Sequence, residues 1–516
     1  MFAVGQQDMK KIDAFTIEQL GLPGVVLMEN AGARVVEEVQ SLLQKKTGKV
    51  LLFAGGGNNG GDGFVIARRL HDLGIDTLLC LLVTPQQITG DAKVHFQAYV
   101  QRKLPISYID QLAFEDLENE IEQADILVDA MLGTGVNGAL RSPFKEVISL
   151  INQFAGKKPI IAVDIPSGVQ SDTGRVESVA VQATKTITFV YPKKGFFLNQ
   201  GPKYIGEWKA VDISVPPHIV DGLGLTLPTV VTPDLIQSIM PVRPTNGHKG
   251  TFGHVLVIGG AKKYVGAPIF SAKAALASGA GLVTLAVPEC NHQVAAIHCP
   301  EALMLALPDE EGHIAHESAY LLREQLSTFK SVAIGPGLSR FLDGDKWIRT
   351  IIDNLHGQPL VIDADGLYQI RHQLEIVKAY GGPVIITPHP GEMAMLLQKT
   401  VAEVEDNRLE IVKEIAETYQ LYVLLKGHRS VIATPSGAVY INPYGNDALA
   451  KGGSGDVLTG VIVSFLAQGF SPEAAVICAC YLHARAGEEQ ARILSHYGVL
   501  PGDLIDGVRN QLIEIC

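Results

Sequence analysis

Short apolar runs alternate with amphipathic, helix-compatible stretches along most of this 516-residue chain. The segment 5–45 predicts helices. In the first half, the strand-like runs then lie at 49–55, 77–83, 125–131, 159–165, 183–195 and 207–214. In the second half they lie at 254–260, 281–288, 331–337, 359–366, 383–392 and 422–428. Apolar strands separated by helices are typical of a parallel sheet covered on both faces. The pattern therefore predicts an α/β protein.

The alternation breaks at residues 216–234, PPHIVDGLGLTLPTVVTPD, where proline and glycine are frequent and no period is visible. We interpret this segment as a linker. A chain of 516 residues also exceeds the size of one ordinary core. The prediction is two α/β domains, 1–215 and 235–516, which share a fold class but not their motifs.

Composition narrows the class of protein. Hydrophobic residues make up 47% and charged residues 19%, as in a well-buried globular protein. The net charge of −12 argues against broad electrostatic binding to nucleic acid. The N-terminus lacks the layout of a signal peptide, and no apolar run is long enough to span a membrane. Six cysteines in so long a chain form no disulfide framework, so we expect a cytoplasmic protein without membrane or nucleic-acid partners.

One group of residues hints at a metal. Cys290, His292, His298 and Cys299 are close in sequence, but their spacing matches no standard set of zinc ligands. We favour a short amphipathic helix over a zinc site.

Three motifs of the first half directly follow strand-like runs. They are GGGNNGGDG at 55–63, DAMLGTGVNGA at 129–139 and DIPSG at 164–168. Ligands of a doubly wound sheet bind at the carboxyl ends of its strands, so the three motifs are expected to share one site. Loop glycines let N–H groups approach a phosphate. Asn59, Asp129 and Ser167 offer oxygen ligands for a hard cation, and Asp164 could move a proton.

Each of these motifs also has a purely structural interpretation. A glycine-rich turn after a strand is often only a tight turn, and an aspartate at a strand end is often a helix N-cap. The coincidence of three such motifs favours a functional site.

The second half carries a different loop, GNDALAKGGSGDVLTG at 445–460, ahead of an apolar helix. Asp456 in this loop would lie among the N–H groups of a helix N-terminus, which can bind a transferring phosphoryl group. A carboxylate there can take a proton from a substrate hydroxyl. The alternative is a capping aspartate on a buried helix. The length of the run favours the functional interpretation.

Four further segments support a site in this half. They are KYVGAP at 263–268, GPGLS at 335–339, TPHPGE at 387–392 and KGHRS at 426–430. Taken alone, His389 could be a structural histidine and Lys426 a surface charge. Asp363 and Asp365 fit helix caps, magnesium ligands or both, and the sequence does not choose between these roles.

Together, NNGGDG, DAMLGTG and DIPSG resemble the NAD(P)H-hydrate epimerase domain over most of 1–215. The resemblance implies a Rossmann-like three-layer sandwich that interconverts the R and S epimers of hydrated NADH and NADPH. It implies a potassium ion held by Asn59, Asp129 and Ser167, with Asp164 as the acid/base group. The residues that would contact the hydrated dinucleotide are Asn58, Asn59, Gly60, Gly61, Asp62, Gly133, Thr134, Gly135, Val136, Asn137, Gly138, Ala139 and Asp164.

TPHPGE and the GGSGD run resemble the ribokinase-like superfamily, and within it the ADP- or ATP-dependent NAD(P)H-hydrate dehydratase, over roughly 235–510. The resemblance assigns Ala267, Gly337, His389 and Asp456 to the hydrated dinucleotide. It assigns the adenine nucleotide to Lys426, Gly427, His428, Arg429, Ser430 and Gly455. The family often has threonine where this chain has Ser454, a mild change that should keep the turn.

The combined prediction is a bifunctional repair enzyme, both isomerase and lyase, that acts on hydrated NADH or NADPH. The fused architecture resembles a bacterial form that uses ADP, with magnesium, as phosphoryl donor. We expect small-molecule partners and a homo-oligomer. One alternative is a vitamin kinase for a thiazole or pyridoxal-like alcohol, fused to a regulatory domain. Another makes the first half a binding module, although its intact NNGGDG, Asp129 and Asp164 argue against that.

Overall fold

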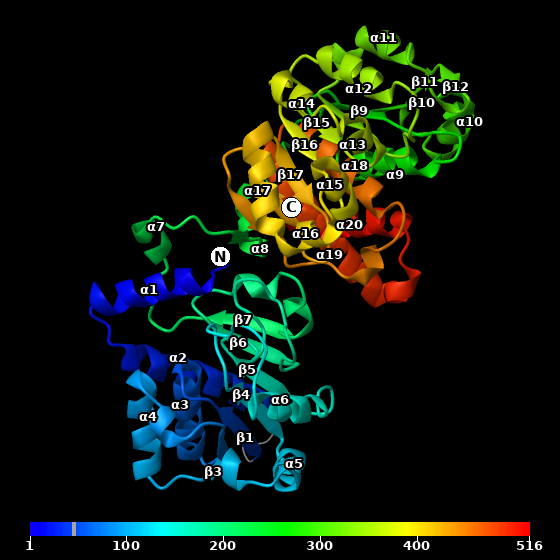
Figure 1. Cartoon of the computed structure of the whole chain (residues 1–516). Coiled ribbons are helices and arrows are strands. Elements are labelled where there is room, and N and C mark those ends of the chain that lie inside the picture. The colour runs from blue at the N-terminus through cyan, green and yellow to red at the C-terminus, as the bar shows by residue number, and fades with distance from the viewer. Residues whose placement is uncertain (44–47, 516) are drawn as a thin grey trace. The chain divides into compact units, whose positions relative to one another are not determined.

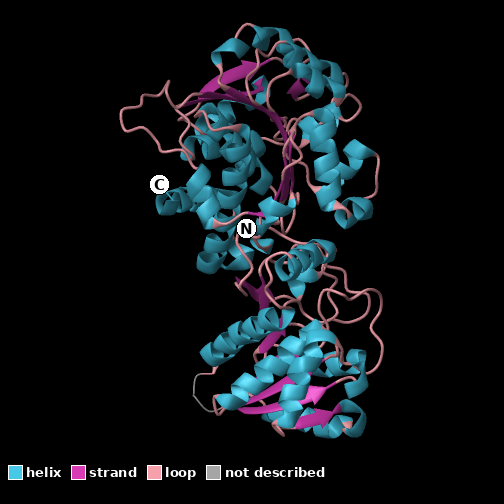
Figure 2. Ribbon diagram, turned by 90° about the vertical axis from the view of Figure 1, so that its left-hand side faces the viewer, coloured by secondary structure: helices cyan, strands magenta, loops and turns pink. Residues whose placement is uncertain are grey.

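The computed structural model describes residues 1–43 and 48–515 and divides the chain into two compact units, Met1–Leu227 and Pro228–Cys516. Figure 1 labels their elements. The last two residues of the predicted helical segment 5–45 lie outside the described residues. Each unit contains a largely parallel sheet with helices on both sides (Figure 2), which confirms the predicted α/β fold class. No helix of the described part is both long and apolar enough to cross a bilayer.

The first unit is built on a seven-stranded, fully parallel sheet of order β3-β2-β1-β4-β5-β6-β7. Its strands are β1 Lys49–Ala54, β2 Asp76–Leu81, β3 Ile106–Tyr108, β4 Ile126–Ala130, β5 Ile160–Val163, β6 Lys185–Phe189 and β7 Glu207–Val211. Its helices are α1 Gln6–Glu18, α2 Gly24–Leu42, α3 Asn58–Asp72, α4 Gly90–Gln101, α5 Phe114–Gln123, α6 Phe144–Asn152 and α7 Ile219–Leu223. The order runs outward in both directions from β1 and β4, so the topological switch point lies between these two strands.

Alternation along β1 explains why both faces of this sheet are covered. Val50, Leu52 and Ala54 belong to a buried core shared with α1 to α4, whereas Leu51 and Phe53 belong to a second core shared with α5 and α6. Successive side chains of a strand point to opposite faces. A strand that is apolar at every position therefore requires helices on both sides, as the continuous apolar run at 49–55 predicts.

The second unit is built on a ten-stranded sheet of order β11-β10-β9-β14-β15-β16-β17-β18-β19-β8. Its strands are β8 Thr229–Val230, β9 His254–Ile258, β10 Leu282–Pro288, β11 Leu303–Leu307, β14 Ser331–Ile334, β15 Leu360–Ile362, β16 Val384–Ile386, β17 Tyr422–Leu425, β18 Val431–Ala433 and β19 Val439–Ile441; β12 Asp309–Glu310 and β13 His313–Ile314 form a separate hairpin. The sheet is parallel from β11 to β17, and β18 is antiparallel to both of its neighbours.

The helices of the second unit place its loops. They are α8 Pro233–Ile239, α9 Gly266–Ala277, α10 Glu289–His298, α11 Ser318–Arg323, α12 Gly344–Asp353, α13 Asp365–Ile370, α14 Glu375–Tyr380, α15 Pro390–Leu397, α16 Val401–Asp406, α17 Arg408–Tyr419, α18 Ser454–Ala467, α19 Pro472–Gly498 and α20 Pro501–Ile515. Helix α18 is almost wholly buried and packs on α9. Gly460 permits this approach, because a Cβ there would lie 2.2 Å from the Ser271 carbonyl oxygen.

The segment 216–234, which the sequence predicts as a linker, contains ordered elements. Helix α7 lies in the first unit. Strand β8 pairs with β19 of the second unit, and the Thr232 side chain caps α8 by accepting from the Leu235 N–H. The boundary between the compact units falls after Leu227, within the predicted linker. Two-residue strands such as β8 have no visible period, which is why the pattern did not indicate it.

Candidate functional site

The first unit contains a cavity of about 720 Å³ at the carboxyl ends of β1, β4 and β5. It is bordered by loops from all three predicted motifs, as expected for a switch-point site. The predicted residues that line it are Asn58, Asn59, Asp62, Gly133, Thr134, Gly135, Val136, Asn137 and Asp164. Gly60, Gly61, Gly138 and Ala139 are not among the lining residues. A Cβ on Gly60 would meet the Gly55 carbonyl and one on Gly61 the Met28 side chain, so these two glycines let α3 approach the loop after β1 and helix α2.

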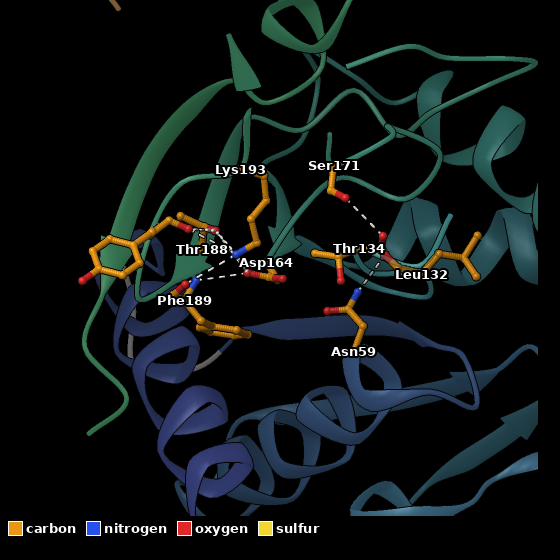
Figure 3. A network of polar contacts seen from close by, with 9 residues as sticks. Asn59, Leu132, Thr134, Asp164, Ser171, Thr188, Phe189 and Lys193 are labelled. Carbon is orange, nitrogen blue, oxygen red and sulfur yellow. Dashed lines mark hydrogen bonds and ion pairs between the residues drawn. The ribbon is translucent and has the colours of Figure 1, made fainter. Parts of the chain in front are cut away.

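The three predicted cation ligands converge on the loop that follows β4. The Ser167 hydroxyl donates to the Asp129 carboxylate at 2.6 Å, and the Leu132 N–H donates to the Ser167 oxygen at 2.8 Å. The Asn59 side-chain amide donates to the Leu132 carbonyl at 3.0 Å (Figure 3). The other atom of that amide, Oδ1, is buried and has no hydrogen-bond partner. Burial raises the pKa of Asp129 to about 6, although Ser167 hydrogen bonds oppose the shift.

Asp164 forms a compact polar group with a buried lysine. Its Oδ1 accepts from the Lys193 ammonium at 2.5 Å, from the Thr188 hydroxyl at 3.1 Å and from the Phe189 N–H at 3.1 Å (Figure 3). The Lys193 side chain is 1% exposed. Its ammonium also contacts the Thr188 hydroxyl at 2.9 Å and the Tyr191 carbonyl at 3.2 Å. These contacts fix the carboxylate at the edge of the cavity.

Two strained turns shape this group. Asp164 has φ +64°, and the Ile165 N–H donates to the Val163 carbonyl, which closes a three-residue turn centred on Asp164. Val190 also has φ +64°, and the Tyr191 N–H donates to the Phe189 carbonyl, which closes a second three-residue turn. Three-residue turns with a positive central φ are rare and strained, above all at a β-branched residue. Such strain persists where the surrounding structure enforces it, typically at functional sites.

The sequence analysis missed four charged residues that line this cavity, Lys10, Asp13, Asp91 and Lys193. Lys193 lies just beyond the end of β6, in YPKKG, and its position at a strand end was an available signal. Asp13 lies within α1, where nothing in the local pattern distinguishes it from an ordinary helix-surface aspartate.

The second unit contains a cavity of about 820 Å³ beside the N-terminus of α18. The predicted residues that line it are His389, Lys426, Gly427, His428, Ser430 and Gly455. Arg429 is not among them and instead donates to the Gly445 carbonyl at 3.1 Å. Ala267, Gly337 and Asp456 lie outside the lining. Ala267 and Gly337 are close together, because a Cβ on Gly337 would be 3.0 Å from that of Ala267. They follow β9 and β14, the neighbouring strands at the switch point of this sheet.

Lys426, which lines this cavity, forms an ion pair with the buried Asp363. The Lys426 ammonium is 2.8 Å from the Asp363 carboxylate and 3.8 Å from Glu392. The second Asp363 oxygen accepts from the Thr459 hydroxyl at 2.7 Å. Burial disfavours the charged form of Asp363, but the Lys426 charge and the hydrogen bonds from Lys426 and Thr459 together lower the pKa of the carboxyl. Asp363 is therefore an anchor for Lys426, whereas Asp365 accepts from the Ser339 N–H at 2.8 Å.

Asp456 lies in the first turn of α18 and is half-buried. Burial raises its pKa to about 7, and the neighbouring Asp363 carboxylate adds to the shift while Lys426 opposes it. A Cβ on the adjacent Gly455 would be 3.4 Å from the Lys426 ammonium nitrogen. The arrangement joins a carboxylate that titrates near neutrality, a cation and a helix N-terminus. That combination suits proton abstraction coupled to phosphoryl transfer.

His389 caps a helix and is also exposed to the cavity. Its Nδ1 accepts from the Glu392 N–H at 3.1 Å, and Glu392 accepts in return from the His389 N–H at 2.8 Å, which forms a capping box at the start of α15. The side chain is nevertheless 56% exposed and borders the cavity. Its capping role does not prevent contact with a ligand.

Two buried residues support this site and were missed from sequence. Arg408 donates to the carbonyls of Leu425, Lys426 and Arg429 and so holds the KGHRS loop from below. His483 lies against Ser454, with its Nε2 3.0 Å from the Ser454 carbonyl oxygen. Burial lowers the pKa of His483 to about 4. Neither residue belongs to a recognisable motif.

The segment proposed as an amphipathic helix, with Cys290 to Cys299, forms α10 and its C-cap. Within residues 1–43 and 48–515, no three His, Cys, Asp or Glu side chains are grouped so as to hold a metal ion. The potassium candidates Asn59 and Ser167 are outside those four residue types.

Comparisons with known proteins match two families to different parts of the chain. Residues 24–195 match the family described as YjeF-related protein N-terminus, and residues 255–510 match NAD(P)H-hydrate dehydratase. The bifunctional NAD(P)H-hydrate repair enzyme Nnr of Moorella thermoacetica is 38% identical over 511 residues, which cover 98% of this chain and 96% of that protein. The enzyme of the same name from Thermofilum pendens is 34% identical over 484 residues, which cover 93% of this chain and 90% of that protein.

Among solved structures, the ADP/ATP-dependent NAD(P)H-hydrate dehydratase of Bacillus subtilis, co-crystallised with ATP and Mg²⁺, is 31% identical. The match covers 56% of this chain and 99% of that chain, with a TM-score of 0.49. The near-complete, 38% identical match to a two-part relative confirms the resemblance drawn from the motifs of both halves. This chain belongs to the family of bifunctional NAD(P)H-hydrate repair enzymes.

Proposed function

We propose that this chain repairs NADH and NADPH that have taken up water at the nicotinamide ring, using one site in each unit. The first unit interconverts the R and S epimers of the hydrate. The second removes water from the S form at the expense of ADP, giving AMP and phosphate. The observation that carries the proposal is that one chain, alignable over nearly its whole length with bifunctional repair enzymes, contains a cavity at each predicted site.

In the first unit, Asp164 acts as an acid/base group at the hydrated ring. Its position beside the cavity and its three donors support this role, since a carboxylate that moves protons must be held within reach of its substrate. The glycine-rich loop after β1 and the loop after β4 surround the phosphates of the dinucleotide. The first-turn N–H groups of α3 favour an anion there.

Potassium fits the group formed by Asn59, Asp129 and Ser167. The unpartnered, buried Asn59 Oδ1 is an oxygen ligand without a donor. Asp129 is buried, and a cation would favour its charged form. The ion would be held by these three side chains, and its positive charge would fix the loop at Leu132 against the dinucleotide.

In the second unit, Asp456 removes the proton of the C6 hydroxyl while the hydroxyl oxygen attacks the terminal phosphoryl group of ADP. Lys426 and the first-turn N–H groups of α18 stabilise the charge that develops on the phosphoryl oxygens. The C6–O bond then breaks with departure of phosphate, C5 loses a proton, and the ring double bond is restored. Phosphorylation makes the hydroxyl a good leaving group, which is why nucleotide is consumed in a net dehydration.

Magnesium fits this site as an ion that arrives with the nucleotide. Magnesium is usually bound by one or two carboxylates together with substrate phosphates. Two carboxyl groups, Glu392 and Asp456, lie close enough to Lys426 to raise the pKa of its ammonium. Such an ion would neutralise phosphate charge. We further expect a homo-oligomer that acts in the cytoplasm.

The vitamin-kinase alternative is not favoured, because the relatives that match the whole chain are repair enzymes. The test is to supply a mixture of R- and S-hydrated NADH with ADP or with ATP and to follow NADH absorbance and free phosphate. The expected result is full recovery of NADH with equimolar phosphate. Accumulation of a phosphorylated product would contradict the proposal. Repair of the S form alone, with the R form left unchanged, would also contradict it.

A further inference from the structure

The epimerase cavity contains more carboxyl groups than Asp164. Asp13 from α1 and Asp62 from α3 also line it, together with the single buried cation Lys193. Asp62 is 7% exposed, and Asp13 is half-buried. The other charged lining residues are the exposed Lys10 on α1 and the half-buried Asp91 on α4. Four carboxyl groups therefore line the cavity, and three of them, Asp13, Asp62 and Asp164, come from α1, α3 and the loop after β5.

Lys193 does not neutralise all three. An ammonium has three donors, and those of Lys193 are directed to Asp164, the Thr188 hydroxyl and the backbone carbonyls of Phe189 and Tyr191. Asp164 thus receives the one internal counter-charge. Among the described residues no cation lies within salt-bridge distance of Asp13 or Asp62, and three neighbouring carboxylates cannot all stay ionised in a desolvated pocket.

The electrostatics agree with this geometry. Burial raises the pKa of Asp13 to about 6, with Lys193 opposing and Asp164 reinforcing the shift. Burial also raises the pKa of Asp62 well above its usual range, and the charges of Asp164 and Asp13 add to this effect. Both shifts favour the protonated form of these two residues, beside a carboxylate that is paired with lysine. Carboxyl groups whose environments differ in this way commonly divide the acid and base roles.

We propose that Asp13 and Asp62 share one proton and form the second acid/base group of the epimerase site, acting together with Asp164. The inference rests on the proposed epimerase function and extends it, since Asp13 belongs to none of the three motifs and the motif resemblance gives Asp62 only a binding role. Inversion at C6 requires a proton for the departing hydroxyl and a base for the water that returns. The hydroxyl leaves from one face of C6 and water returns to the other, so one carboxylate at a fixed position does not serve both.

Epimerisation by this route needs no reactant other than water. The Asp13–Asp62 pair gives its proton to the C6 hydroxyl, the C6–O bond breaks, and water leaves with the bonding electrons. The N1 lone pair forms a C6=N1 iminium ion. Water adds to the other face of C6 and loses a proton to Asp164, and the proton returns to the pair through solvent.

The test uses the full-length chain with hydrated NADH and no nucleotide, so that only epimerisation proceeds. We compare Asp13→Asn, Asp62→Asn and the double variant, with Glu18→Gln as control. Glu18 is an exposed carboxylate on the same helix and is not part of the cavity lining. Repair of pure S-hydrate with ADP, measured on each variant, reports whether the second unit is intact.

Each single variant should epimerise about 10²–10⁴-fold more slowly, the range for loss of a general acid or base. The double variant should lose little more than the slower single variant, because the residues act as one unit. Glu18→Gln should keep the wild-type rate. Asp13→Glu retains a carboxyl and should recover part of the rate, whereas a residue needed only for packing would tolerate the longer side chain worse than asparagine.

A wild-type epimerisation rate for Asp13→Asn would overturn the inference. If the fold-losses in rate of the two single variants multiply in the double variant, the inference that Asp13 and Asp62 share one proton is wrong. Failure of the wild-type chain to interconvert the epimers is a different outcome, because it would remove the proposed epimerase function itself.

Discussion

The Lys426 ammonium lies 2.8 Å from the Asp363 carboxylate, whose side chain is only 2% exposed, and Thr459 donates to the other Asp363 oxygen. Lys426 directly follows β17, Asp363 directly follows β15, and Thr459 lies in α18, so these contacts join the KGHRS loop, the centre of the sheet and α18. A buried pair of this kind loses much of its stability when only one partner is removed, because the other charge remains uncompensated.

Lys426→Met should therefore destabilise the second unit by about 3–5 kcal/mol and abolish ADP binding. Thr459→Val is the matched control, because it removes one hydrogen bond to Asp363 and leaves the cation in place. It should cost about 1–3 kcal/mol and leave ADP affinity nearly unchanged. Chemical denaturation and calorimetric titration with ADP measure the two effects. Equal loss of ADP binding in both variants would mean that Lys426 acts only through stability.

Asp456→Asn should lower dehydratase turnover by about 10²–10⁴-fold, equivalent to roughly 3–5 kcal/mol of barrier. The change keeps the size of the side chain and removes the proton acceptor. ADP affinity and epimerisation should change little. Steady-state rates with S-hydrate provide the measurement, and a near-wild-type rate would require another base.

The pH dependence of Asp456 gives an independent prediction. The base works only when ionised, and its pKa is raised to about 7, mainly by burial and then by Asp363. Dehydratase kcat/KM should thus rise with pH and level off above about 7. Because the folded-state pKa exceeds the unfolded value of 3.8, ionisation opposes folding increasingly between 3.8 and about 7. Asp456→Asn should accordingly raise the Tm of the second unit more at pH 8 than at pH 5. A flat activity profile across this range would contradict the assignment.

Asp129→Ala should abolish epimerisation and leave repair of S-hydrate intact. In the wild-type chain, potassium chloride should raise the Tm of the first unit relative to an equal ionic strength of tetramethylammonium chloride. The variant should lose this difference, whereas Asp110→Ala, an exposed site in the same unit, should keep it. Retention of the potassium effect in Asp129→Ala would place the ion elsewhere.

The two units should fold as separate fragments, and a fragment of the second unit should begin before β8. A fragment 228–516 retains the β8–β19 pairing and the Thr232 cap of α8, which a fragment 235–516 loses. The longer fragment should be more stable by at least about 1 kcal/mol, the usual contribution of a helix cap. Both should repair S-hydrate, and R-hydrate only at its spontaneous epimerisation rate. Equal repair of both epimers by either fragment would contradict the division of labour.

The sequence by itself determined the α/β class, the central strands of both sheets and the loops that border both cavities. Each of these is a local property. A continuous apolar run such as 49–55 predicts a strand buried on both faces, and a glycine-rich loop at its end predicts a site at the sheet edge. The motifs at Asp164 and Asp456 could be found for the same reason.

Only the tertiary structure decided which other residues join them. Asp13 is far from Asp164 in the chain, and it reaches the same cavity because α1 forms part of that cavity's wall. Lys193 resembles any other lysine in sequence, and its burial against Asp164 depends on the turn at Val190. Arg408 supports the KGHRS loop through backbone carbonyls, an interaction that carries no sequence pattern. Periodicity reports which face of an element is buried, but contacts between distant elements are settled only when the chain folds.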